Sequence, residues 1–170
     1  MSLHKLTVLA LYTTLSLAIF AIESVIPPLV PLPGIKLGLA NIITLILLQH
    51  YSAKDAFLVL IARILLSSFL FGQALSLLYS LIGGSLSFAV MFISNHLLLK
   101  KAPFLTGALG GLCHNMGQLL TAFAVTASTG VFIYSPYLAI SGILTGFFTG
   151  LSAHFAGRYI LPHIRQLSDH

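Results

Sequence analysis

Long apolar runs, separated by short polar or proline-rich breaks, follow one another along most of the chain. Within each run the apolar residues are continuous rather than alternating, which favours membrane-spanning α-helices over the strands of a barrel. Four prolines in the segment 27–36 close the first run, because proline lacks an amide donor and fixes φ. The run after this segment is short for a full crossing. The pattern predicts six transmembrane helices, at about 5–26, 37–51, 55–72, 74–99, 104–128 and 136–161.

The composition places these spans in a single all-α integral membrane protein. Of the 170 residues, 58% are apolar and only 6% are charged, and the mean hydropathy is +1.03. Soluble domains are usually about a quarter charged, so most soluble enzymes and nucleic-acid-binding domains are excluded. The first run continues into Glu23 and the prolines without a small-residue cleavage site, so we expect the first helix to be kept. The single cysteine, Cys113, excludes an internal disulfide.

Basic residues gather on one side of the predicted membrane, and Lys36 stands alone on the other. Cytoplasmic loops of membrane proteins carry an excess of lysine and arginine, so the net charge of +5 indicates topology rather than nucleic-acid binding. We expect a multi-pass protein of the cell membrane with both termini in the cytoplasm. The basic residues on the cytoplasmic side are Lys5, Lys54, Lys100, Lys101, Arg158 and Arg165.

Polar side chains inside the spans mark candidate sites, because a charge in hydrocarbon costs about 2.5–3.5 kcal/mol on insertion scales. Two interpretations stay open. The residues either pair with one another to hold the helices together, or they line a ligand pocket in the outer half of the membrane that the proline-rich segment covers. The candidates are Glu23, Lys36, Asn41, Arg63, His114, Asn115 and Gln118.

The fifth span favours the pocket through its spacing. Gly107, Gly111, His114/Asn115 and Gln118 follow i, i+4, i+7/8 and i+11, so they share one helical face. The glycines allow another helix to approach the inner half of this face, and the polar residues occupy its outer half. Helix packing alone does not require three polar groups in succession.

Two stripes of small residues predict close contacts between helices. Gly142, Gly146 and Gly150 in the sixth span indicate internal packing, with His154 one step further. In the first span, the stripe Ala10, Thr14 and Ala18 fits internal packing or docking of another membrane subunit equally well. The seven histidines are dispersed, and neither a metal site nor a cofactor is predicted.

Two motifs and one arginine resemble the Gx transporter family, whose members carry the label heptaprenyl diphosphate synthase component I. Ile22-Glu23 and the proline-rich loop lead into the first motif, Pro33 to Ile42 (PGIKLGLANI). The second motif is Gly107 to Gln118 (GALGGLCHNMGQ), and Arg63 lies between the two. The resemblance covers nearly the whole chain.

This family is similar to the substrate-binding S components of energy-coupling factor transporters, which are small six-helix membrane proteins that bind micronutrients from outside. The resemblance implies an S-component-like bundle, a small-molecule ligand, and as partners a coupling membrane protein with two ATPase subunits. It also implies docking on that coupling protein through Ala10, Thr14 and Ala18, although Thr14 departs from the usual all-alanine form.

Catalysis is not expected of this chain. Allylic diphosphate synthases resemble one another in aspartate clusters that hold magnesium, whereas Glu23, Asp55 and Asp169 are isolated here. We expect a transport binding subunit in which Lys36 and Arg63 attract an anionic or polar ligand. The alternative is a non-catalytic membrane accessory of isoprenoid or quinone synthesis that binds a prenyl chain. A solute carrier that works alone is disfavoured, since no internal repeat is visible.

Overall fold

The computed structural model describes residues 3–26, 35–71, 74–98 and 101–160, and within these ranges the chain is helical without strands. The short 3₁₀ helix η1 (Thr129–Tyr134) leads into the last long helix, and the π-helical turn η2 (Ala156–Ile160) follows it. The long helices agree with the predicted spans to within a few residues, apart from the second. They are α1 (Leu3–Val25), α2 (Asn41–His50), α3 (Ala53–Phe71), α4 (Ala74–Leu97), α5 (Pro103–Thr126) and α6 (Ser135–Phe155).

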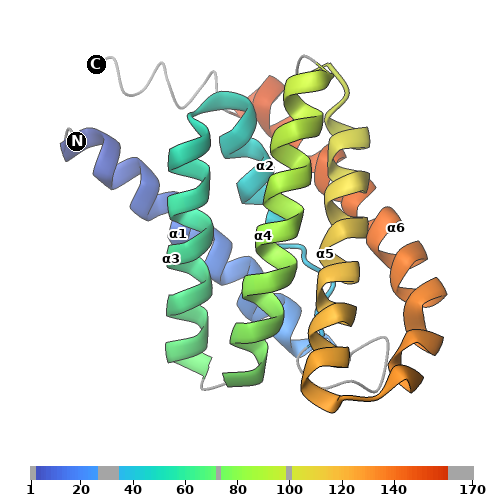
Figure 1. Cartoon of the computed structure of the whole chain (residues 1–170). Coiled ribbons are helices and arrows are strands. Elements are labelled where there is room, and N and C mark those ends of the chain that lie inside the picture. Colours follow the sequence, from blue (N-terminus) through green and yellow to red (C-terminus); the bar gives the residue numbers. More distant parts are fainter. Residues whose placement is uncertain (1–2, 27–34, 72–73, 99–100, 161–170) are drawn as a thin grey trace.

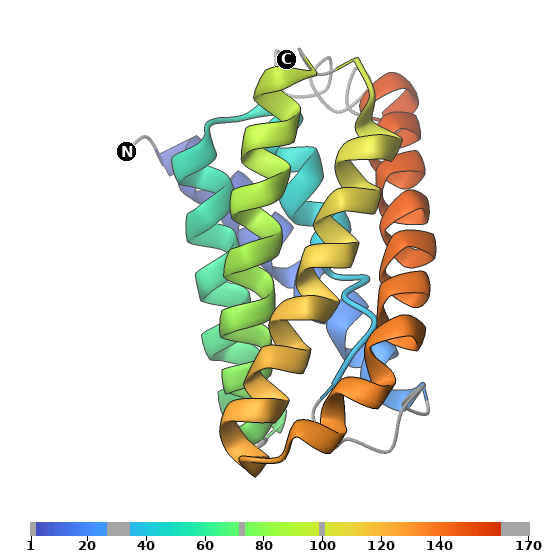
Figure 2. The same ribbon diagram turned by 45° about the vertical axis from the view of Figure 1, so that its right-hand side comes forward.

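The helices form a bundle around α2. Helices α3 to α6 run side by side, α1 crosses them obliquely, and α2 lies between them (Figures 1 and 2). The start of α1 and the end of α6 lie at the same end of the bundle (Figure 1). We call this the terminal end, and the end that carries η1 the distal end.

The helix in the second predicted span begins later than expected, at Asn41 instead of about residue 37, and this corrects the sequence analysis. Residues 35–40 are not helical, and α2 covers only the ten residues from Asn41. At 1.5 Å per residue α2 is about 15 Å long, roughly half of the 30 Å hydrocarbon thickness. The non-helical segment 35–40 carries the chain from α2 toward the distal end through the interior of the bundle (Figure 2). Gly38 makes this path possible, because its φ of 82° strains any residue with a side chain.

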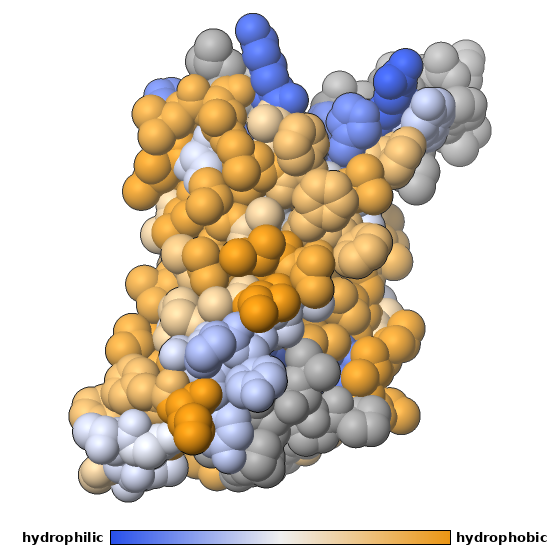
Figure 3. All heavy atoms as spheres, turned by 90° about the vertical axis from the view of Figure 1, so that its right-hand side faces the viewer, coloured by the Kyte–Doolittle hydropathy of each residue, from blue (hydrophilic) through white to orange (hydrophobic). Residues whose placement is uncertain are grey.

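The distribution of polarity is that of a membrane protein. Large apolar side chains face outward, for example Phe69 (87% exposed) and Tyr137 (69%), whereas Asn115 and Gln118 are each only 1% exposed. Figure 3 shows one face covered mainly by apolar residues, with the most hydrophilic residues at its upper, terminal end. Such a surface is unsuited to water and matches hydrocarbon.

Within the described ranges, three helices are long and apolar enough to cross a membrane by length and composition: Leu3–Val25, Ala74–Leu97 and Thr129–Tyr159. Helix α3 contains Lys54, Asp55 and Arg63, and α5 contains several glycines and amides, so both are less apolar. The number of membrane crossings therefore stays a prediction.

Glycines bring α5 and α6 into direct backbone contact, as their spacing predicts. A β-carbon added at Gly107 would collide with the carbonyl oxygen of Gly146, and one added at Gly111 would collide with that of Gly142. Gly150 lies equally close to the backbone of Pro103. This seam is the most intimate helix contact of the described fold, and it fixes α6 beside the face of α5 that carries the polar motif.

Candidate ligand-binding site

The non-helical segment 35–40 obtains several of its hydrogen bonds from side chains of distant helices. The Lys36 backbone N–H donates to Gln118 Oε1 (3.1 Å), and the Gly38 N–H donates to Glu23 Oε1 (2.6 Å). Unpaired backbone groups are costly in hydrocarbon, and irregular backbone at membrane depth occurs only where protein surrounds it. Two carbonyl groups of the segment accept from hydroxyls: Leu37 from Thr145 (3.3 Å) and Ala40 from Ser16 (3.4 Å).

A cluster of charged side chains surrounds Phe20, which is 3% exposed. The Lys36 ammonium lies 3.6 Å from the centre of the ring, and the Arg63 guanidinium carbon lies 6.0 Å from it. Both cations are close enough for their charges to act on the Glu23 carboxylate. The four residues come from α1, α3 and the segment 35–40, and we call them the cation cluster.

The cation cluster holds more positive than negative charge. Neither cation forms an ion pair within 4 Å of Glu23; Lys5–Asp55 is such a pair elsewhere in the described ranges. The Nζ atom of Lys36 and the Nε and Nη2 atoms of Arg63 are buried without a hydrogen-bond partner among the described residues. Glu23 lies near both cations, and its Oε1 accepts a hydrogen bond from the Gly38 N–H instead.

Buried donor atoms without partners on two cations are unusual, because buried polar groups are nearly always hydrogen-bonded. One carboxylate cannot balance two charges, and one of its oxygens already accepts from the backbone. A group that supplies negative charge or acceptor oxygens beside Phe20 would satisfy both Lys36 and Arg63.

Gln118 links the cation cluster to His114. Its Oε1 must be the oxygen, since the Lys36 N–H can only donate, so its Nε2 donates to His114 Nε2 at 2.9 Å. His114 is then a neutral imidazole that accepts at Nε2 and carries its proton on Nδ1. That Nδ1 lies against Gly83 of α4 without a hydrogen bond to the described residues.

The two asparagines differ in position. Asn41 stands at the start of α2, where its Nδ2 donates to Ser87 (3.3 Å) and lies beside Gly38, and its Oδ1 has no partner in the described chain. Asn115 instead points toward α6, where its Nδ2 donates to the Leu138 carbonyl (2.8 Å) and to Ser141 (3.0 Å).

The polar face of α5 is therefore divided, which corrects the single face expected from spacing. His114 and Gln118 point toward α4 and the segment 35–40, whereas Asn115 and the glycines of the seam point toward α6. Because α4 and α6 pack on different sides of α5, residues that are adjacent on its helical wheel contact different helices. Of the seven candidates, six gather around the segment 35–40 and Asn115 lies apart.

A narrow crevice continues from Gly38 and Asn41 toward the terminal end, between α2 and the α5–α6 seam. It is too narrow to admit a water molecule in this conformation. The proline-rich segment that is predicted to cover the site lies, for residues 27–34, outside the described residues. The crevice is also lined by Leu37, Met91, Gly107, Gly111, Thr145, Gly146 and Thr149.

Sequence reasoning missed Phe20, Thr145 and Ser16. Phe20 lies in a long apolar run and gives no polar signal. Thr145 and Ser16 look like ordinary helix hydroxyls, and only the path of the segment 35–40 reveals their second role.

The predicted docking stripe faces outward. Ala10, Thr14 and Ala18 are all exposed on α1, which leaves internal packing without support, and Thr14 donates its hydroxyl to the Ala10 carbonyl (3.0 Å). Whether a partner uses this surface stays a prediction.

An apolar exterior and a buried, incompletely paired cation cluster define a helical membrane protein with a polar interior site. Residues 12–156 match the family model described as heptaprenyl diphosphate synthase component I. The chain belongs to this family, which confirms that part of the resemblance. No curated protein and no solved structure matches.

Proposed function

We propose that the chain is the membrane-embedded binding subunit of an uptake system for a small organic solute, of the energy-coupling factor type. The observation that carries this proposal is the set of unpartnered donors on Lys36 and Arg63 beside Phe20. An anionic or acceptor-rich solute with a flat or apolar part fits such a site. Lys36 and Arg63 would bind its oxygens, and the ring of Phe20 would contact its apolar part.

The proposal includes six membrane crossings with the terminal end in the cytoplasm. In support, Lys5, Lys54, Lys101 and Arg158 lie near the ends of helices that meet at the terminal end (Figure 1). The cation cluster then lies in the outer half of the membrane. Segment 35–40 and α2 together make the second crossing, which needs no further helix.

A non-catalytic role is part of the proposal. Glu23 is near the distal end of α1, and Asp55 begins α3 at the terminal end, where it pairs with Lys5 (2.7 Å). These two described carboxylates are too far apart to hold one metal ion on a diphosphate. Energy for uptake would come from ATPase partners, with a coupling membrane protein docking on Ala10, Thr14 and Ala18.

The second candidate is a non-catalytic membrane accessory of isoprenoid synthesis, which the description of the family favours. The same cations would then bind the diphosphate of a prenyl chain. This candidate predicts stable association with a soluble synthase, whereas the uptake subunit associates with membrane and ATPase subunits.

Native mass spectrometry of the protein purified from its own host tests the proposal. We expect a co-purified small solute that is retained by the wild type and lost from Arg63→Gln. Asn95→Ala is the matched control, since Asn95 is a buried amide near the terminal end that donates to the Leu48 carbonyl (3.1 Å). A prenyl diphosphate with a bound synthase would favour the second candidate. Equal retention by Arg63→Gln and wild type would refute both roles for the cluster.

A further inference from the structure

A second cavity opens at the terminal end of the bundle, away from the cation cluster. Its volume is about 260 Å³, and the end of α2, the start of α5 and the turn η2 surround it. Gly157 allows η2 to lie against α2, because a β-carbon there would collide with the His50 imidazole. The cavity is lined by Gln49, His50, Pro103, His154, Gly157 and Arg158.

The lining is basic. Arg158 carries a positive charge, His50 and His154 add ring nitrogens that can bind a ligand, and none of the lining residues is acidic. Lys101, which is exposed, precedes Pro103 by two residues. An arginine presents several donors in a fixed fork that suits phosphate oxygens.

Exposed aromatic side chains of α6 and η2 lie next in sequence to residues that line the cavity. Phe155 is 50% exposed and stacks on Tyr159, at 6.0 Å between ring centres, and Arg158 lies 5.6 Å from the Tyr159 ring. Aromatic rings of this kind lie at the level of lipid headgroups. A ligand with a phosphate and an acyl chain could place the first in the cavity and the second along α6.

We propose that this cavity is a binding site for the phosphate headgroup of an anionic phospholipid, with Arg158 as its main contact. The site is independent of the solute proposed for the cation cluster. Basic pockets between transmembrane helices on the cytoplasmic side are suited to anionic headgroups, and the lipid would hold α2, α5 and η2 together at the membrane surface.

The test uses the full chain in bilayers that contain equal amounts of phosphatidylglycerol and phosphatidylcholine, with bound lipids counted by native mass spectrometry. We expect the wild type to retain phosphatidylglycerol in preference, and Arg158→Gln to lower this preference about fivefold, the effect typical of one cation near a membrane surface. His154→Gln should lower it by less. Lys54→Gln is the matched control, because Lys54 is an exposed cation that does not line the cavity.

Three outcomes would overturn the proposal. The first is a wild type that shows no preference for phosphatidylglycerol. The second is an Arg158→Gln variant that retains phosphatidylglycerol as well as Lys54→Gln does, while both variants unfold at the wild-type temperature. The third outcome comes from an experiment in which inorganic phosphate is added to the purified protein. Displacement of phosphatidylglycerol by inorganic phosphate at similar concentration would assign the cavity to a soluble phosphate instead of a lipid.

Discussion

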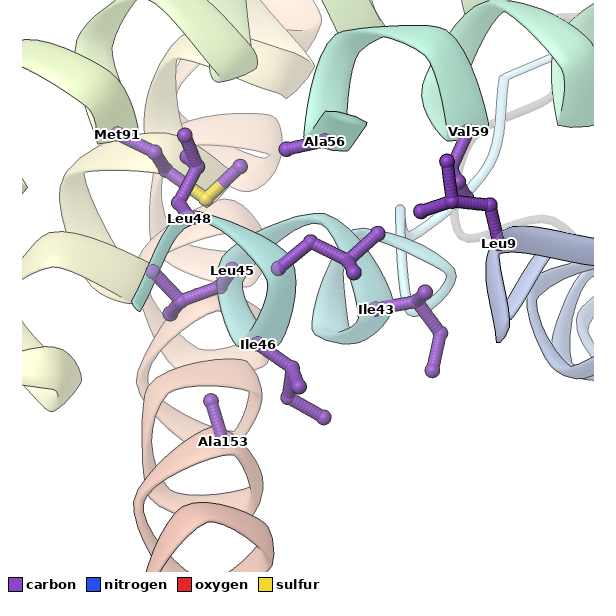
Figure 4. Packing of buried hydrophobic residues seen from close by; sticks show 10 residues of the cluster. Leu9, Ile43, Leu45, Ile46, Leu48, Ala56, Val59, Met91 and Ala153 are labelled. Carbon is purple, nitrogen blue, oxygen red and sulfur yellow. The ribbon is translucent and has the colours of Figure 1, made fainter. Parts of the chain in front are cut away.

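Two consecutive stretches of the chain, the segment 35–40 and helix α2, have opposite surroundings. Helix α2 lies in an apolar cluster, in which Leu45 and Leu47 are fully buried and side chains of α1, α3, α4 and α6 contact it (Figure 4). The segment 35–40 is surrounded by the carboxylate, amide and hydroxyl groups that bond its backbone.

The difference follows from where the backbone hydrogen bonds are made. A helix satisfies its own N–H and C=O groups, so its neighbours need only fill space. In the segment 35–40 only the carbonyls of Gly38 and Leu39 accept from nearby backbone N–H groups, and other groups of its backbone bond to polar side chains in the interior of the bundle. Backbone bonding explains Glu23 and Gln118, but it does not explain the buried donors of Lys36 and Arg63 that lack partners among the described residues, and these two cations indicate a ligand.

The largest effect is expected from Glu23→Ala. This substitution removes the only described carboxylate near the buried Arg63 and the half-buried Lys36, and it removes the acceptor for the Gly38 N–H. Removing one partner of a buried charged set costs about 4 kcal/mol. Denaturant titration in detergent micelles should show this loss, and Glu23→Gln should lose less because its amide oxygen still accepts from Gly38. Wild-type stability of Glu23→Ala would contradict the account.

Leu45→Ala tests the apolar cluster around helix α2. Leu45 is fully buried in α2, and the cavity left by such a substitution costs about 3 kcal/mol. The same titration measures the loss. We expect the folded fraction to retain its solute as the wild type does. A loss of solute like that of Arg63→Gln would show that the apolar cluster around α2 and the cation cluster are not independent.

Gly38→Ala should destabilise by about 2 kcal/mol, because its φ of 82° is left-handed and the new β-carbon would lie 2.7 Å from His114 Cδ2. Gly130→Ala is the matched control, since it lacks a positive φ and would approach only the Ser128 hydroxyl, at 3.3 Å. Similar unfolding midpoints for the two variants would argue against the path of the segment 35–40.

Asn115→Ala is expected to have the smallest effect. It removes the bonds to Leu138 and Ser141 and should cost about 1 kcal/mol. Because Asn115 points toward α6, solute retention in the mass spectrum should be unchanged. Loss of solute from a well-folded Asn115→Ala variant would show that Asn115 takes part in solute binding.

Much of the helical bundle was predictable, because long apolar runs closed by proline, glycine or lysine define α1, α3, α4, α5 and α6. The start of α2 was not. The apolar sequence of Leu37, Leu39 and Ala40 predicts a helix. The positive φ of Gly38 and its hydrogen bond to Glu23 depend on contacts with residues far away in the sequence.

The candidate site was predictable in part. Charges within apolar runs identify Glu23, Lys36 and Arg63, and the structure brings the two cations to one ring, with Glu23 near both. Phe20 could not be singled out, because an aromatic residue in an apolar run carries no distinguishing signal. The division between Gln118 and Asn115 depends on which helices flank α5, and spacing along one helix contains no such information.

The most direct test is the stability of Lys36→Met in the absence of added solute. Methionine has a similar length and still packs on Phe20, but it removes an ammonium group whose buried Nζ lacks a partner among the described residues. If Lys36 exists to bind an anionic solute, solute-free Lys36→Met should unfold at a higher temperature than solute-free wild type and should no longer retain the solute. A lower unfolding temperature would mean that Lys36 holds the fold together, and would contradict the binding site.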